Sequence, residues 1–172
     1  LYLSYLWLFI WSIRPLSLLY SLKTGITHKV FITNQYIKLK NNQIGIIGVG
    51  YWGTNIVNVL QKIGVNNICC YDKISNNLKE IKNKFPKVKI ENNYERFLTY
   101  NHDGIIIAVD TNSHFQIAKD CLNKGFNIFV EKPVTNSAKK LKFLTKLARS
   151  KNLFIMGGYI YFYNDYIKYI KK

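Results

Sequence analysis

The sequence predicts an α/β protein built on a doubly wound parallel sheet of about six strands. From residue 43 onward, short apolar runs of strand length alternate with amphipathic segments of helix length. Such alternation is typical of parallel β-α-β units with right-handed crossovers. Glycines in the G-x-G-x-x-G spacing also stand where the first apolar run meets the first amphipathic segment, a frequent position for a tight strand-to-helix turn in these sheets.

The most definite pattern extends from Gln43 to Asp72. An apolar run over residues 43–47 is followed by the glycines, then by a predicted helix over 54–64 and a second apolar run over 67–71. The three glycines are Gly48, Gly50 and Gly53. Because the glycines follow a strand, open a helix and precede an acid at the end of the next strand, the pattern is far more specific than the glycine spacing alone.

Each residue of this pattern has a physical role. Gly48 permits the tight turn, Gly50 lets the backbone approach a pyrophosphate, and Gly53 lets the helix pack closely on the strand. The helix N-terminus directs its N–H groups and positive dipole end at the phosphates. Asp72 would accept hydrogen bonds from a ribose 2′-OH and repel a 2′-phosphate. The segment predicts a dinucleotide site for NAD; Lys73, next to the acid, keeps NADP as the alternative, and an ordinary tight turn is the other interpretation.

The remaining segments continue the alternation. The predicted helices begin near residue 75 or 76, 94, 113 and 136 or 137 and end near 85, 100, 124 and 150, and the predicted strands cover 87–90, 104–109, 126–130 and 153–156. Ligands of such sheets bind at the carboxyl ends of the strands, near the point where the strand order reverses. Those ends carry Gly48 to Gly50, Asp72, Val109 with Asp110, and Glu131 with Lys132. We therefore expect four loops to converge on one crevice.

The formal net charge is +16, which by itself would favour a nucleic acid or an anionic membrane as partner. The lysines, however, are scattered over predicted solvated helix faces and turns, and no RNA-binding motif with interleaved aromatic residues occurs. We therefore expect no nucleic-acid partner.

Cysteine and histidine placement argues against disulfides and metal sites. Cys69 and Cys70 are neighbours in a predicted strand, so their side chains point to opposite faces, and no C-x-x-C pair occurs. Together with Cys121 they are expected to be buried thiols in a reducing cytoplasm. His28, His102 and His114 are too dispersed to predict a metal site.

Residues 1–41 do not continue the pattern. The run from Leu1 to Ile13 is apolar and rich in aromatic residues, is broken at Arg14, and continues weakly over 16–22. Residues 1–13 are too few to cross a bilayer, and 1–22 would suffice only if Arg14 reached the interface or a partner. Three interpretations remain: a membrane anchor, a genuine extra element, or an upstream extension outside the native protein. The last is favoured, so we do not expect a membrane partner.

Several short motifs point to one known family. They are Gly48-Val49-Gly50-Tyr51-Trp52-Gly53, Ala108 with His114, Gly125, Val130-Glu131-Lys132-Pro133, Gly157-Gly158-Tyr159 and Tyr163-Asn164. Over about residues 43–164 the chain thereby resembles the glucose-fructose oxidoreductase/inositol dehydrogenase (Gfo/Idh/MocA) family of NAD(P)-dependent oxidoreductases. The Gly-Tyr-Trp-Gly form of the loop is similar to the branch that acts on nucleotide-linked sugars, such as UDP-N-acetylglucosamine 3-dehydrogenases.

The resemblance implies a Rossmann dinucleotide-binding domain with defined residue roles. The backbone of the glycine loop, through Tyr51 and Trp52 to Gly53, would hold the pyrophosphate, and Asp72 would hold the adenosine ribose. The residues implied to line the rest of the dinucleotide are Ala108, Val109, Asp110, His114, Glu131 and Lys132.

Lys132 is the catalytic residue that the resemblance implies. It would lie near the nicotinamide ribose and the substrate hydroxyl, with Pro133, often cis in the family, turning it inward. A lysine between an apolar strand and a proline is expected to be desolvated and able to stabilise or protonate an oxygen during hydride transfer. An ordinary surface lysine is the alternative.

The chain departs from the family at three places. Val109-Asp110 stands where the family usually has Thr-Pro, and a carboxylate near cofactor phosphates is unfavourable unless it points to water. Tyr159 replaces the histidine of the family's Gly-His pair. The chain also ends at Lys172, whereas family members continue into a second α/β domain that binds substrate and makes the oligomer contacts.

These observations predict three segments: an N-terminal extension over 1–41, an NAD-binding domain over 42–157, and the start of a truncated substrate domain over 158–172. The function expected is an NAD-dependent oxidoreductase that transfers a hydride between nicotinamide and a sugar or nucleotide-sugar hydroxyl carbon, with a homo-oligomer only if the second domain is present. The alternatives are a non-catalytic NAD-binding module or remnant, and a dehydrogenase anchored through residues 1–22.

Overall fold

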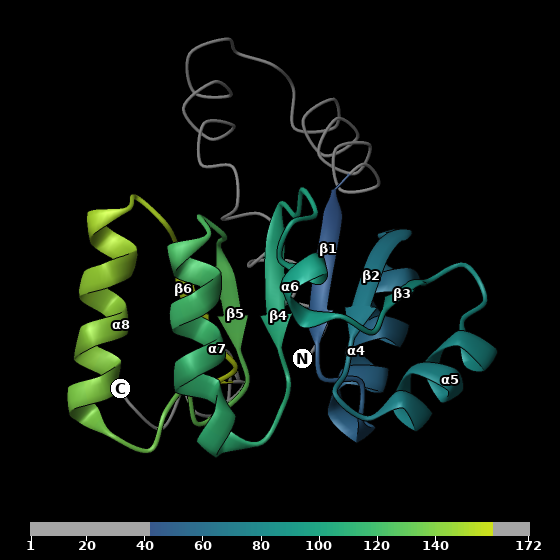
Figure 1. Ribbon diagram of the computed structural model, residues 1–172, viewed down its shortest axis with the longest axis horizontal. Coiled ribbons are helices and arrows are strands. Elements are labelled where there is room, and N and C mark those ends of the chain that lie inside the picture. Colours follow the sequence, from purple (N-terminus) through teal and green to yellow (C-terminus); the bar gives the residue numbers. More distant parts are fainter. Residues whose placement is uncertain (1–41, 160–172) are drawn as a thin grey trace, which may run out of the picture.

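The computed structural model describes residues 42–159, which form a six-stranded sheet with helices on both faces (Figure 1). The strands are β1 (Gln43–Ile47), β2 (Asn67–Tyr71), β3 (Lys89–Glu91), β4 (Gly104–Ile107), β5 (Ile128–Val130) and β6 (Ile155–Gly157). All five pairings are parallel, and the strand order is β3-β2-β1-β4-β5-β6. The order reverses between β1 and β4, so the predicted doubly wound sheet is confirmed.

The connecting helices divide between the two faces of the sheet. They are α4 (Tyr51–Lys62), α5 (Ser75–Lys84), α6 (Tyr94–Phe97), α7 (Thr111–Asn123) and α8 (Ala138–Ser150). The apolar residues of α4 and α5 pack in one core cluster, and those of α6, α7 and α8 pack in the other. Each helix buries a single apolar stripe because its apolar residues recur at helical spacing.

The two core clusters explain why the four central strands, β2, β1, β4 and β5, are mostly apolar. Adjacent strand residues enter opposite clusters: Cys70 packs with α4 and α5, whereas Cys69 packs with the helices of the other face. A strand that is covered on both faces cannot alternate apolar with polar residues. The three cysteines are buried and free, as expected from their positions in the sequence.

Element positions agree with the sequence expectations, and the differences lie at the ends. Helix α4 begins at Tyr51, three residues before the predicted start, because Gly53 belongs to its first turn. Strand β4 ends at Ile107, so Val109 and Asp110 lie in the loop that follows. The expectations for residues 1–41, and for 160–172 of the predicted second domain, lie outside the described residues. Within residues 42–159, none of the helices combines the length and apolar character needed to cross a bilayer.

Candidate dinucleotide site

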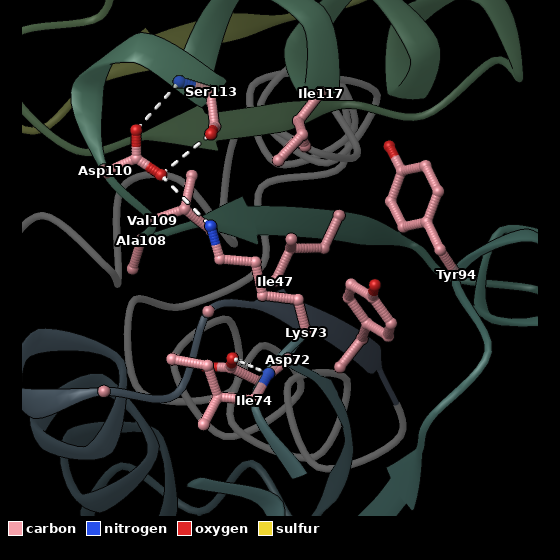
Figure 2. Close-up of a pocket in the computed structure, with 13 residues that line it drawn as sticks. Ile47, Asp72, Lys73, Ile74, Tyr94, Ala108, Val109, Asp110, Ser113 and Ile117 are labelled. Carbon is pink, nitrogen blue, oxygen red and sulfur yellow. Dashed lines mark hydrogen bonds and ion pairs between the residues drawn. The ribbon is translucent and has the colours of Figure 1, made fainter.

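A cavity of about 500 Å³ lies at the carboxyl ends of β1, β2 and β4 (Figure 2). Its lining comes from the ends of β1 and β2, the glycine loop, the loops after β2 and β4, one face of α7, and the start of α6. The lining residues are Ile47, Gly48, Gly50, Tyr71, Asp72, Lys73, Ile74, Tyr94, Ala108, Val109, Asp110, Ser113 and Ile117. The cavity therefore opens at the switch point of the sheet, the usual place for a ligand in this architecture.

Two glycines of the loop are required by close backbone contacts. Gly48 has φ +90°, and a Cβ there would lie 2.5 Å from the carbonyl oxygen of Ala108. A Cβ on Gly53 would lie 1.9 Å from the carbonyl oxygen of Gly48. Neither position can hold a side chain without moving backbone, so both glycines fix how β1, α4 and β4 meet.

Gly50 differs from these two, because a Cβ on it would meet no atom of the described residues within 4 Å, its two chain neighbours aside. It is the N-cap of α4, its φ is −68°, and no side chain caps the helix. The first backbone bond of the helix is donated by Thr54 N–H to Gly50 O at 2.9 Å. The N-terminal turn thus directs its N–H groups and positive dipole end toward the open space beside Gly50, an arrangement suited to an anion.

The carboxylate of Asp72 connects the loop after β2 to the glycine loop. Its Oδ2 accepts hydrogen bonds from Val49 N–H at 2.8 Å and from Asn77 Nδ2 at 3.0 Å. Its Oδ1 accepts one from Ile74 N–H at 2.8 Å. Since a carboxylate oxygen offers about two acceptor positions, Oδ1 retains capacity for one further donor.

Asp110 begins α7 as its N-cap. Its carboxylate accepts hydrogen bonds from Ser113 N–H at 3.2 Å and from the Ser113 hydroxyl at 2.8 Å. The Ser113 hydroxyl bond is the largest cause that lowers the pKa of this carboxyl. Half of the side chain is exposed, so the carboxylate that replaces the family's proline serves as a solvated helix cap.

The inner part of the cavity is apolar and aromatic. Tyr71 and Tyr94 pack with ring centroids 5.3 Å apart, and Ile117 of α7 lies near them (Figure 2). Burial raises the pKa of the Tyr94 hydroxyl. Ile74, half exposed, lies on the other side, so the cavity provides apolar walls for a flat ring.

His114 is buried and does not belong to the cavity lining. Its Nδ1 lies 2.8 Å from Pro133 O, and its Nε2 lies 3.0 Å from Val109 O. The imidazole thereby connects the loop after β4 to the loop after β5. Within the described residues its role is to position these two loops.

The remaining residues predicted for the site lie outside the cavity lining. Tyr51 and Trp52 are exposed at the start of α4 and pack edge to face, with centroids 5.3 Å apart. Glu131 and Lys132 follow β5, next to β4 in the sheet, and the Lys132–Pro133 peptide bond is cis. The side chain of Lys132 is exposed, so the desolvation expected from its apolar neighbours is not observed.

Of the twelve predicted site residues, the structure gathers six in the cavity: Gly48, Gly50, Asp72, Ala108, Val109 and Asp110. Sequence reasoning missed Ile47, Tyr71, Ile74, Tyr94, Ser113 and Ile117, and it considered Lys73 only for its bearing on NADP. For Ser113 and Ile117 the sequence offered one signal: they are one helical turn apart, so they lie on the same face of the helix. Tyr94 gave no such signal, because it reaches the cavity through α6, which follows the edge strand β3. Within the described part of the chain there is no cluster of three metal-ligating side chains.

The chain is similar to known oxidoreductases. The model of an oxidoreductase family with an NAD-binding Rossmann fold (GFO_IDH_MocA) matches residues 42–159. An uncharacterized oxidoreductase of Schizosaccharomyces pombe is 33% identical over 72 residues, which cover 41% of this chain and 20% of that protein.

Two solved structures show the same fold. UDP-N-acetylglucosamine 3-dehydrogenase GnnA from Acidithiobacillus ferrooxidans superimposes with a TM-score of 0.67 at 22% identity, covering 75% of this chain and 42% of that one. GenD2 from gentamicin A biosynthesis, in complex with NAD, gives a TM-score of 0.63 at 18% identity, covering 68% of this chain and 34% of that one.

The match thus spans a fifth of the Schizosaccharomyces relative and about two fifths or less of the two solved chains. The family model, by contrast, covers well over half of this chain and every described residue. The glycine loop, the acid that ends β2, the strand order and the position of the cavity are the features expected of that fold. The chain belongs to the Gfo/Idh/MocA oxidoreductase family with an NAD-binding Rossmann fold.

Proposed function

We propose that this chain is the NAD-binding part of an oxidoreductase that acts on a sugar or nucleotide-sugar hydroxyl. The observation that carries the proposal is the open space beside Gly50, at the start of α4, where no side chain caps the helix. Gly50 also lines the cavity, together with Asp72. The helix start suits an anion, and the neighbouring carboxylate of Asp72 suits a ribose.

The described residues fit NAD part by part. The backbone at Gly50 and the first turn of α4 would hold the pyrophosphate. Asp72 Oδ1 would accept one hydrogen bond from the adenosine ribose, and the apolar walls formed by Ile74, Val109 and Ile117 would enclose the adenine. NAD is preferred to NADP in this proposal because a buried carboxylate ends β2.

Bound NAD would accept a hydride from the substrate carbon that bears the hydroxyl. Lys132 would act at the hydroxyl oxygen, where its ammonium group can stabilise negative charge or exchange a proton. Two features support this role: Lys132 lies at the carboxyl end of β5, and β5 adjoins β4, whose loop lines the cavity. The Glu-Lys-Pro motif of the family supports it further.

A non-catalytic NAD-binding module is the second candidate. It is favoured by the exposure of Lys132, which lies outside the cavity lining. Either protein would work in a reducing compartment such as the cytoplasm, because its described cysteines are free thiols.

Hydride transfer distinguishes the two candidates. The chain is titrated with NAD by calorimetry, and the protein of which it is the NAD-binding part is assayed for NADH formation with UDP-N-acetylglucosamine and with free sugars. If the protein is an oxidoreductase, it binds NAD and reduces it. The variant Lys132→Ala should then lose turnover while its NAD affinity changes less than about threefold. The control variant Lys139→Ala, at an exposed lysine, should leave both turnover and NAD affinity unchanged. Binding without turnover on any sugar favours the module. Failure to bind any dinucleotide contradicts the proposal.

A further inference from the structure

Two charged side chains from separate loops meet beside the cavity. Lys73 follows β2 and Asp110 caps α7, and Lys73 Nζ lies 3.9 Å from Asp110 Oδ2. Figure 2 shows the lysine side chain extending from the β2 loop toward the β4 loop. The side chains are 74% and 52% exposed, so this is a solvated ion pair that can exchange partners at little cost in free energy.

The net charge of the cavity lining is negative, whereas the net charge of the whole chain is positive. The chain carries a formal +16, yet the cavity lining contains one cation, Lys73, and two carboxylates, Asp72 and Asp110. Asp72 is largely occupied, since three donors already bind its carboxylate. Among residues 42–159, Lys73 is thus the only cation of the lining, and Asp110 is the anion paired with it.

Asp110 has little freedom to move away from Lys73. Both of its carboxylate oxygens accept hydrogen bonds from Ser113, one from the backbone and one from the hydroxyl. The same bonds stabilise the first turn of α7, so the carboxylate position is set by the helix cap. Lys73, by contrast, has a long flexible side chain that can follow a ligand.

We infer that Asp110 is a specificity-determining residue, which selects a dinucleotide without a 2′-phosphate by neutralising Lys73. The inference rests on the proposed function, in which the cavity holds the adenosine end of NAD. A 2′-phosphate carries up to two negative charges and would need Lys73 as its partner. With Asp110 beside it, Lys73 offers that phosphate little net attraction, and the Asp110 carboxylate adds repulsion.

The test compares ligands that differ only at the 2′ position. Dissociation constants of the full chain are measured for NAD and NADP, and for ADP-ribose and 2′-phospho-ADP-ribose, which lack nicotinamide. The variants are Asp110→Asn, Lys73→Gln and the two combined; asparagine retains the capping ability of aspartate. Glu80→Gln is the matched control, since it removes one exposed carboxylate from α5 outside the cavity lining.

Asp110→Asn is expected to improve NADP affinity relative to NAD by roughly five- to tenfold at low salt, with less effect near 1 M salt. Adding Lys73→Gln should remove that gain, and Glu80→Gln should not produce it. The inference is overturned if wild type binds dinucleotides but Asp110→Asn leaves the NAD-to-NADP ratio unchanged, or if Glu80→Gln changes it equally. Wild-type protein that binds none of the four ligands would instead contradict the proposed function, and the inference with it.

Discussion

The carboxylate of Asp72 accepts a hydrogen bond from the backbone N–H of Val49 at 2.8 Å, across 23 positions of the sequence. The acid assigned to the ribose therefore also holds the glycine loop in place. Its side chain connects the carboxyl ends of β1 and β2. Loss of this carboxylate should consequently affect both folding and dinucleotide binding.

Asp72→Asn is the first test of that dual role. The amide can accept at only one of the two oxygen positions, so we expect a loss of about 2 kcal/mol in the free energy of unfolding. NAD affinity should fall by at least about tenfold. Asn77→Ala removes a single donor to the same carboxylate and should cost about 1 kcal/mol with little effect on NAD. Denaturant unfolding and calorimetric titration measure the two effects; a fully stable Asp72→Asn variant would refute the structural role.

Gly50→Ala and Gly53→Ala separate binding from folding within one loop. A methyl group at Gly50 meets no atom of the described residues apart from its chain neighbours, so the free energy of unfolding should change by less than about 1 kcal/mol. The methyl group reduces the space for a phosphate, however, so NAD affinity should fall about tenfold or more. A methyl group at Gly53 collides with Gly48 O, so this variant should lose about 3 kcal/mol or fail to fold. Equal NAD affinity of Gly50→Ala and wild type would show that no phosphate approaches this backbone.

Glu91 should make stability depend on acid pH. Its buried carboxylate accepts hydrogen bonds from the Tyr100 hydroxyl, from Arg96 Nε, and from Asn93 N–H. The Tyr100 bond is the largest cause that lowers the pKa of Glu91 from 4.5 to about 2. A lowered carboxyl pKa stabilises the fold above pH 4.5, and this contribution disappears as the pH falls from 4.5 to about 2.

Glu91→Gln tests this dependence. The variant should lose about 2 kcal/mol at neutral pH and show a shallower decline in acid. Unfolding by denaturant at a series of pH values measures both effects. Parallel pH curves for Glu91→Gln and wild type would contradict the assignment.

His102 should destabilise the fold when it is protonated. Its ring packs against Phe97 and Phe126, and Nε2 lies 3.0 Å from Phe97 O. Its Nδ1 is buried and has no hydrogen-bond partner in the described part of the chain. Burial lowers its pKa from 6.5. The unfolded chain therefore binds a proton more readily, so stability should begin to fall as the pH drops through 6.5 and continue to fall until the folded-state pKa is passed.

His102→Phe removes the titrating ring and retains the aromatic packing. The loss of stability between about pH 8 and about pH 5 should be smaller in this variant than in wild type. NMR titration of the His102 ring provides a direct check. A ring that titrates at or above 6.5 in the folded protein would refute the prediction.

The sequence by itself determined the fold class, the elements and the glycine loop. These features depend on local physical chemistry: apolar runs, helical spacing, and glycines whose backbone positions exclude a Cβ. Gly53 could be assigned because the atom that excludes its Cβ, Gly48 O, lies five residues away in the chain, whereas the contact of Gly48 with Ala108 O joins two strands distant in the sequence. The acid at the end of β2 was predictable for the same reason, as it ends a recognisable strand.

Only the tertiary structure decided which side chains share the cavity and how each is engaged. Tyr94 and Ile117 reach it through separate crossovers, and His114 lies outside its lining although the family motif had assigned it to the dinucleotide. Asp110 proved to be a helix cap that pairs with Lys73, a relationship between residues on two different loops. Burial, hydrogen-bond occupancy and charge pairing depend on contacts between distant segments, and the pattern along one segment contains no information about them.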